Sequence, residues 1–159
     1  MLILCLSYKF IGGSSMFSQT YSKKTAEVNI DDVWRVWADI NNWHLWQDDI
    51  DYAKLEGDFC AGNAFIFKPK GMKEVKIRLI QADVNRGFTD LTEFPFAKMY
   101  GIHEFLVNGD ELEIRTTMKV EGLLSFFWWH IVGKKVANSE EEQTVALINR
   151  VQALNLLGS

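Results

Sequence analysis

The feature that most constrains this chain is a change in hydrophobic period near residue 50. From there to about residue 120, apolar and polar residues alternate in short runs that are separated by turn-like segments, a pattern typical of β-strands. The predicted strands cover 50–57, 63–68, 73–82, 86–94, 97–107 and 110–120. Because consecutive strands joined by short turns usually pair side by side, this stretch predicts an antiparallel meander.

The last two predicted strands separate most clearly into a wet and a dry face. A tight turn at Asn108-Gly109 or at Gly109-Asp110 can join them, since these residue types adopt the positive φ angles that two-residue hairpins need. Either turn pairs odd-numbered residues of one strand with even-numbered residues of the other and places His103 on the dry face. The residues predicted to share that face are Met99, Gly101, Phe105, Leu112, Ile114, Thr116 and Met118.

A strand and two short helices are predicted ahead of the meander. The strand covers about 17–29, where Thr, Ser, Tyr and Val are frequent. The segment "DDVWRVWADI" follows, with apolar residues at helical spacing and an aspartate at its start as the cap. "NNWHLWQ" then predicts a second short helix that is capped by Asn41 or Asn42.

Beyond Gly122 the spacing becomes helical again and predicts one long helix at about 123–154. Ser139 and Glu142 have the spacing of a capping box, which leaves a break near Asn138 open. The order of strand, two short helices, six strands and long helix predicts an α+β fold, with about seven antiparallel strands and the long helix across one face.

The break decides where two polar residues of the long helix lie. If the helix is continuous, Glu140 and Gln143 fall on its apolar stripe, and Glu140 can reach His103, Arg78 or the interior. If the helix breaks at Ser139, both residues occupy an ordinary first turn, where the helix dipole favours them. The sequence leaves these two alternatives open.

Composition excludes some classes of function. The 159 residues suit one domain, which we place at 16–157, and we expect residues 1–15 to be a loose N-terminal extension or, alternatively, to add an edge strand at 2–6. The net charge is −4 and no basic block rises above "SKK" and "GKK", so nucleic-acid binding has little electrostatic basis. Cys5 and Cys60 make no disulfide framework, which favours reduced thiols and a cytoplasmic location.

Several segments resemble the START and birch-pollen-allergen (Bet v 1) superfamily, SRPBCC, and in particular its polyketide cyclase/dehydrase-like branch. They are "AEVNIDDVWRVWADINNWHLW" (26–46), "LEGDFCAGNAFIFKPKG" (55–71), "RGFTDLTEFPFAKMYGIHEF" (86–105), "NGDELEIRTTMKVEGLL" (108–124) and the C-terminal helix. Where the pattern often has proline after the first Trp of Trp-x-x-Trp, this chain has His44. The resemblance implies the helix-grip fold, in which a curved sheet wraps around the long helix and leaves an internal cavity.

The high aromatic content, 13% of the residues, fits either an aromatic core or an aromatic cavity. Trp34 and Trp37 are three apart on the first helix, so we expect both to be buried against the sheet. Trp43 and Trp46 share a face of the second helix, where the resemblance places the rim of the cavity. They are interpreted as core or rim packing, or as pocket wall.

His103 is the main candidate for chemistry. It is either a core histidine satisfied by a neighbour such as Thr116, or a polar anchor and general acid or base inside the cavity. The candidate ligand-binding residues are Trp43, Trp46, Phe65, Tyr100, His103, Phe105, Met118, Trp129 and Glu140. Thr92, Glu93 and Arg78 are further polar candidates that strand parity does not rank. His44 lacks the companions that a metal site needs, so we expect no metal and no cofactor.

The segment "SFFWWH" (125–130) is apolar on nearly every side. It predicts core and homodimer contacts, or a lid that admits lipid-like ligands. A role at a membrane surface has less support because few basic residues lie nearby, and we expect no stable membrane insertion.

Three functions remain in competition. The first is the binding or carriage of a small hydrophobic or aromatic molecule in the cavity. The second is a polyketide cyclase- or dehydratase-type enzyme, for which His103 would be the catalytic group. The third is a ligand-free interaction or stress module with a filled core, which an interior cavity below about 300 Å³ would favour.

Overall fold

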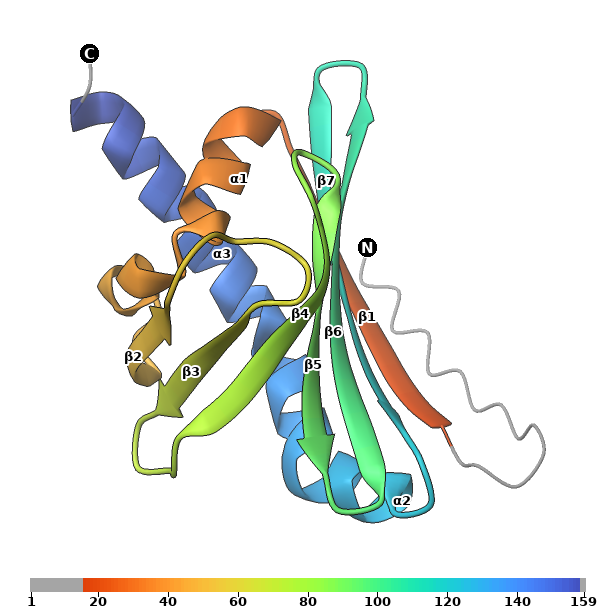
Figure 1. The fold of residues 1–159 in the computed structure, drawn as a ribbon. Helices are drawn as coiled ribbons and strands as arrows, with labels where there is room; N and C mark the ends of the chain where they lie inside the picture. The colour runs from red at the N-terminus through yellow and green to blue at the C-terminus, as the bar shows by residue number, and fades with distance from the viewer. Residues whose placement is uncertain (1–15, 158–159) are drawn as a thin grey trace.

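The computed structural model describes residues 16–157. The segment 1–15, expected to be a loose extension, lies outside the described residues. The described chain folds into one curved antiparallel sheet with helices against one of its faces (Figure 1). This is the predicted α+β helix-grip architecture.

The sheet has seven strands in the order β1-β7-β6-β5-β4-β3-β2, and every neighbouring pair is antiparallel. The first strand closes on the last, while the other six follow one another as the predicted meander. The strands are β1 (Met16–Thr25), β2 (Ile50–Leu55), β3 (Ala64–Pro69), β4 (Val75–Asp83), β5 (Gly87–Phe94), β6 (Ala97–Asn108) and β7 (Glu111–Glu121). The first strand ends at Thr25, short of the predicted 29.

The β6–β7 hairpin has the predicted parity. Asn108 pairs with Glu111, so the two turn residues are Gly109 and Asp110, and Gly109 has a φ of 63°. The register places His103 opposite Thr116. Since Ile114, Thr116, Met118 and Val120 are buried, this face of the sheet is the dry face.

Two short helices connect β1 to β2, as predicted, but their caps differ. In α1 (Ile30–Ala38) the cap is Asn29, whose side chain accepts a hydrogen bond from the Asp32 amide at 2.9 Å. The aspartates therefore lie inside the first turn. The second element is a 3₁₀ helix, η1 (Ile40–Leu45); its cap position is Asp39, which makes no side-chain capping bond, so the expected Asn41 or Asn42 cap is wrong.

The C-terminal helix is continuous through Ser139. It consists of α2 (Ser125–Trp128), a π-helical turn η2 (Trp129–Gly133) and α3 (Lys134–Leu157). The Ser139 hydroxyl donates to the Val136 carbonyl at 2.8 Å, within the same helix, instead of capping a new one. A break at Asn138 is therefore wrong, and Glu140 lies within α3, the helix that runs along the sheet (Figure 1).

The interior between the sheet and α3 is filled with side chains. Its larger apolar cluster includes Trp37, Phe65, Phe88 and Phe105, each at most 7% exposed, and residues of α3 such as Leu147. In this conformation aromatic rings occupy the space in which the resemblance predicts an open cavity.

Candidate functional site

His103 carries the most distinctive polar contacts of the interior. Both ring nitrogens have partners: Nδ1 lies 3.1 Å from the Thr116 hydroxyl, and Nε2 lies 3.2 Å from Oδ2 of Asp90. The side chain is 11% exposed, although it stands on a sheet face made mostly of apolar residues. Thr116 is the partner that the register predicts, whereas Asp90 was not among the predicted candidates.

Asp90 reaches the histidine because of a glycine on the next strand. Asp90 on β5 pairs with Gly101 on β6, two residues before His103. A Cβ atom at position 101 would lie 2.6 Å from Oδ2 of Asp90, so the missing side chain makes room for the carboxylate. A glycine within an otherwise well-alternating strand is a sequence signal from which such a close approach could have been suspected.

Glu140 brings a second carboxyl group to the same place from α3. It is 4% exposed, and its side chain hydrogen-bonds to Thr116. Burial raises the pKa of Glu140 to about 7, because desolvation disfavours the carboxylate. The nearby His103 acts in the opposite direction and lowers this pKa, while the charge of Asp90 raises it further.

These four residues, Asp90, His103, Thr116 and Glu140, form a connected polar cluster, to which we refer below as the polar cluster. It draws on β5, β6, β7 and α3. It offers a histidine between a carboxylate and a hydroxyl, plus a carboxyl group that can hold a proton near neutral pH. Such a set can orient a hydroxyl or carbonyl group and can donate or accept a proton.

Aromatic rings enclose the polar cluster. Phe88 stacks on the His103 ring with centroids 4.3 Å apart, and Trp37 meets the same ring edge-on at 4.8 Å. Phe59, in the loop between β2 and β3, packs on Phe88 at 5.1 Å. Because Phe59 is only partly buried, the series Phe59, Phe88 and His103 leads from the surface loop to the histidine.

The predicted tryptophans belong mainly to the core. Trp37 and Trp43 are 7% and 6% exposed, and the indole N–H of Trp43 donates to the Trp37 carbonyl at 2.9 Å. Trp34 is only partly buried, so the expectation of a buried pair holds for Trp37 alone. Trp46 is partly buried beside Trp43, at 6.3 Å between ring centroids.

The remaining candidates lie at different distances from the polar cluster. Phe65 is buried under Trp43, Phe105 packs against Trp37, and Met118 and Trp129 belong to a second apolar cluster. Tyr100 has the opposite parity to His103 and so lies on the other face of the sheet, where its hydroxyl donates to Glu121.

The other polar candidates do not join the polar cluster. Arg78 and Glu93 form an exposed ion pair, whereas Thr92 is buried. His44 is exposed, and within residues 16–157 no group of three or more His, Cys, Asp or Glu residues could hold a metal ion.

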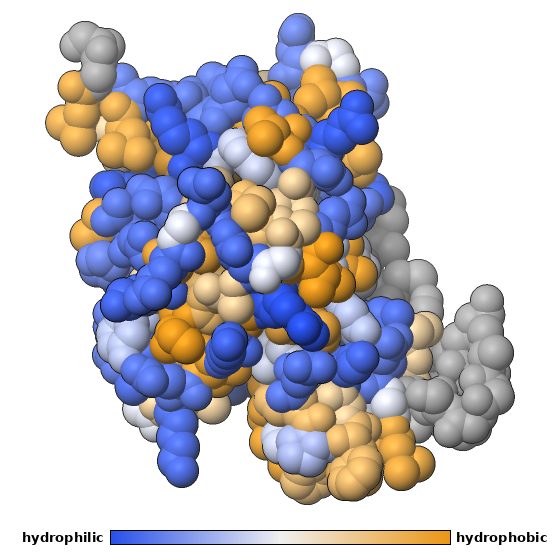
Figure 2. Space-filling model, viewed as in Figure 1, coloured by the Kyte–Doolittle hydropathy of each residue, from blue (hydrophilic) through white to orange (hydrophobic). Residues whose placement is uncertain are grey.

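The segment 125–130 is divided between core and surface. Trp129 is buried and stacks on Phe17, whereas Phe126 and Phe127 are 63% and 49% exposed. The exposed side chains form what we call the apolar patch: Phe96, Leu123, Leu124, Phe126, Phe127 and Ile131. In Figure 2 a hydrophobic area covers the end of the molecule at which α2 lies. None of the described helices is long and apolar enough to cross a membrane.

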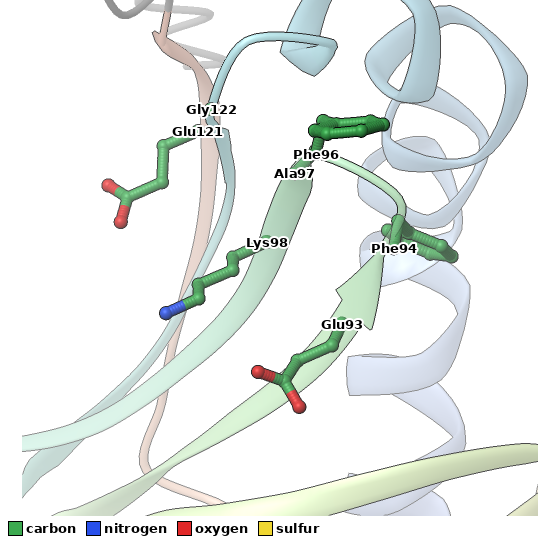
Figure 3. Close-up of a pocket in the computed structure, with 7 residues that line it drawn as sticks. All are labelled: Glu93, Phe94, Phe96, Ala97, Lys98, Glu121 and Gly122. Atoms are coloured by element: carbon green, nitrogen blue, oxygen red, sulfur yellow. The ribbon is translucent and has the colours of Figure 1, made fainter.

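Two hollows of the surface accompany these features. One, of about 340 Å³, adjoins the apolar patch at Phe96 and is bordered by Glu93, Lys98 and Glu121 (Figure 3). The register sets these three charged residues side by side on β5, β6 and β7. The other, of about 410 Å³, lies between the start of α1 and the β6–β7 turn.

No protein-family model matches the sequence, and no curated protein matches it significantly. Solved structures do resemble the fold. Norcoclaurine synthase from Thalictrum flavum, in complex with dopamine and hydroxybenzaldehyde, superposes with a TM-score of 0.67 at 14% identity over 100% of this chain and 99% of that one.

Two further structures agree. Ara h 8.0201 gives a TM-score of 0.65 at 12% identity, covering 86% of this chain and 99% of its own. CalU16 from Micromonospora echinospora gives 0.58 at 15% identity, covering 94% and 90%. At such identities the likeness concerns the fold alone. The chain has the Bet v 1-type helix-grip fold.

Proposed function

We propose that this protein binds a small hydrophobic or aromatic molecule between the sheet and α3, with His103 orienting a hydroxyl or carbonyl group of the ligand. The observation that carries the proposal is the polar cluster, which stands among aromatic rings on the dry face of the sheet. Interior sites of this kind, apolar with a few convergent polar groups, are typical of small-molecule binding.

The polar cluster also weighs against a ligand-free module. Burying ionisable groups costs free energy unless each is paired, and apolar residues of similar size would fill a purely structural core at less cost. The presence of Asp90, His103 and Glu140 together in the interior therefore favours a functional site over a purely structural core. The packed interior is the feature that the third hypothesis predicts, but it also fits a binding site whose rings move when a ligand enters.

A ligand then needs rings to move. Phe88 and Trp37 cover His103, and Phe59 covers Phe88 from the β2–β3 loop. We place the entrance at this loop because the ring of Phe59 is partly exposed and its neighbours Asp58 and Cys60 are exposed. Displacement of Phe59 and rotation of Phe88 would bring a ligand against the imidazole.

The test begins with native mass spectrometry of protein purified without denaturation, to detect molecules that copurify. Candidates are then titrated against the wild type, His103→Gln and the exposed control His44→Gln. We expect partial loss of affinity for His103→Gln, since the amide retains a donor and an acceptor, and no change for His44→Gln. Equal affinities of wild type and His103→Gln, or binding that maps outside the sheet–α3 interior, would overturn the proposal.

A second candidate is an enzyme that moves a proton on the bound molecule. The observation that favours it is the pairing of Glu140, whose pKa is raised to about 7, with the adjacent His103–Asp90 pair. Titratable groups that their surroundings tune differently are typical of acid–base catalysis. One structure with this fold is a synthase that holds an amine and an aldehyde. In an enzyme, His103→Gln would lower turnover by roughly 10²–10⁴-fold while binding survives.

Composition and surface charge also support proposals on the location of the protein and on its partners. We propose a cytoplasmic protein, because Cys5 and Cys60 make no disulfide framework, and one that binds neither nucleic acid nor a membrane stably, given its net charge of −4. We also propose a homodimer formed through the apolar patch, because the adjoining border carries Lys98 between Glu93 and Glu121. A border of both signs can complement a second copy of itself, whereas an anionic membrane attracts a basic surface.

A further inference from the structure

We propose that the Thr116 hydroxyl relays a proton between Glu140 and His103, so that these two residues act as a single acid–base unit. The inference deepens the proposed function, and the use of the relay on a ligand rests on that function. Thr116 is thereby a positioning residue that no sequence motif indicated. It was predicted only as a partner that satisfies His103.

The contacts of the Thr116 hydroxyl support the relay. Thr116 is 1% exposed, and its hydroxyl oxygen lies 3.1 Å from Nδ1 of His103. The same hydroxyl hydrogen-bonds to Glu140, whose side chain is itself buried. A threonine hydroxyl has one proton to donate and lone pairs that accept. The direction of its bond on one side therefore fixes the direction on the other.

Two arrangements satisfy every bond of the chain. In the first, protonated Glu140 donates to Oγ1 of Thr116, and the Thr116 hydroxyl donates to Nδ1 of a neutral His103. In the second, the Thr116 hydroxyl donates to the Glu140 carboxylate, and protonated Nδ1 donates to Oγ1. The first becomes the second when Glu140 passes its proton to Oγ1 and Oγ1 passes its own proton to Nδ1. The number of protons and the net charge do not change.

Asp90 makes both arrangements feasible. As a carboxylate it only accepts, so it holds a proton on Nε2 of His103 in either state. Nδ1 is then the nitrogen that gains or loses a proton, and the charge of Asp90 offsets that of an imidazolium. The pair is held at 3.2 Å, with the Asp90 side chain 15% exposed.

Few other charged groups act on the relay. Asp49, which precedes β2, raises the pKa of Glu140, as Asp90 does. From β1, Tyr21 and Lys23 share the dry face, and Tyr21 interacts with Glu141, the neighbour of Glu140 on α3. The facing positions on β7, which are Ile114, Thr116 and Met118, carry no charge. Proton exchange inside the unit thus depends chiefly on Thr116.

Through the relay, Glu140 would replace a proton that His103 gives to a ligand, or would accept a proton that His103 takes from it. This suits a ligand whose carbonyl or phenolic oxygen lies against the imidazole. There the ligand oxygen would replace Asp90 as the partner of Nε2: the imidazolium would pass its Nε2 proton to that oxygen and would keep on Nδ1 the proton that Thr116 relayed from Glu140.

Nuclear magnetic resonance on the full chain without ligand tests the relay separately from binding. The histidine side chains are labelled with ¹⁵N, and His103 is assigned by comparison with His44→Gln and His130→Gln. Between pH 5 and 8 we expect one averaged Nδ1 line in the wild type and in Thr116→Ser, which keeps the hydroxyl. In Thr116→Val the line should broaden or split, because protons must then exchange through solvent.

Glu140→Gln gives a second arm that does not depend on Thr116→Val being folded. The glutamine amide can donate to or accept from Oγ1 but has no titratable proton to pass to it, so the Nδ1 line should no longer average between the two arrangements and should differ from that of the wild type. The relay is overturned if Thr116→Val, shown to be folded by its amide spectrum, gives the same averaged line as the wild type, or if Glu140→Gln leaves the Nδ1 line unchanged. A missing ligand would overturn the proposed function and leave this result intact.

Discussion

At the scale of single residues, Glu140 links the site to stability. Its folded pKa is raised to about 7 from the usual 4.5, so between these values the folded chain binds a proton that the unfolded chain releases. The contribution of Glu140 to the free energy of unfolding is therefore largest below about pH 4.5, decreases as the pH rises to about 7 and stays constant above that value. The loss is on the order of 3 kcal/mol.

Urea unfolding at pH 5 and pH 8 checks this prediction. The free energy of unfolding of Glu140→Gln should decrease much less between pH 5 and pH 8 than that of the wild type. The variant should also be more stable than the wild type at pH 8, because the amide carries no charge to desolvate. The exposed neighbour Glu142→Gln is the matched control and should retain the wild-type decline. Parallel curves for the wild type and Glu140→Gln would show that Glu140 ionises freely in the folded protein.

Residues of the site differed in how far the sequence predicted them. The His103–Thr116 pair followed from strand parity across the turn at Gly109, which a single alternation pattern determines. Asp90 was missed because its approach depends on a register and on the space above Gly101, which are properties of two strands together. The position of Glu140 depended on helix continuity, which the local capping signal at Ser139 could not decide.

At the scale of elements, Trp37 fastens α1 to the sheet. Its ring contacts Phe88 and Phe105 at 5.4 and 5.5 Å, and the side chain is 7% exposed. Trp37→Ala should lower the free energy of unfolding by about 3–5 kcal/mol, since removing a large buried ring leaves a cavity. Chemical denaturation measures the change, with Trp34→Ala, from a partly buried neighbour, expected to cost less. A loss below about 1 kcal/mol would show that the Trp37 ring is not part of the core.

Element type and order were predictable, whereas their ends and caps were less so. Alternation and helical spacing extend over many residues, and burial of a whole face enforces them. Caps depend on one side chain each: Asn29 replaced the expected aspartate because the helix begins at Ile30, ahead of both aspartates. The π-helical turn ends at Gly133, where a Cβ atom would lie 2.8 Å from the Trp129 ring, a contact that no local pattern reveals.

At the scale of the whole molecule, the apolar residues form both an aromatic interior and an exposed patch at one end. High aromatic content predicted either a core or a cavity, and the sequence could not separate these because the same rings serve both. In the structure they close over His103. The apolar patch, by contrast, leaves six large side chains exposed at one end of the fold: Phe96, Leu123, Leu124, Phe126, Phe127 and Ile131.

Phe96 gives the apolar patch a feature that folding alone does not explain. It follows Pro95 in the two-residue β5–β6 turn with a φ of 58°, a conformation that favours glycine, and its ring is 72% exposed. A bulky residue kept in a strained backbone position and facing solvent supports an interaction role. We therefore expect the apolar patch to hold two copies of the chain together.

Sedimentation equilibrium tests this expectation. The wild type should dimerise, and Phe96→Gly should weaken dimerisation at least about tenfold, which corresponds to about 1.4 kcal/mol. Its thermal stability, measured at a dilution where both proteins are monomers, should be within about 1 kcal/mol of the wild type, because relief of the strained φ offsets the flexibility of glycine. Val84→Ser, at an exposed apolar residue outside the apolar patch, should dimerise as the wild type does. A wild type that stays monomeric at about 100 μM would exclude a homodimer through this surface, because a dissociation constant well above that concentration corresponds to less than about 5.5 kcal/mol of binding free energy.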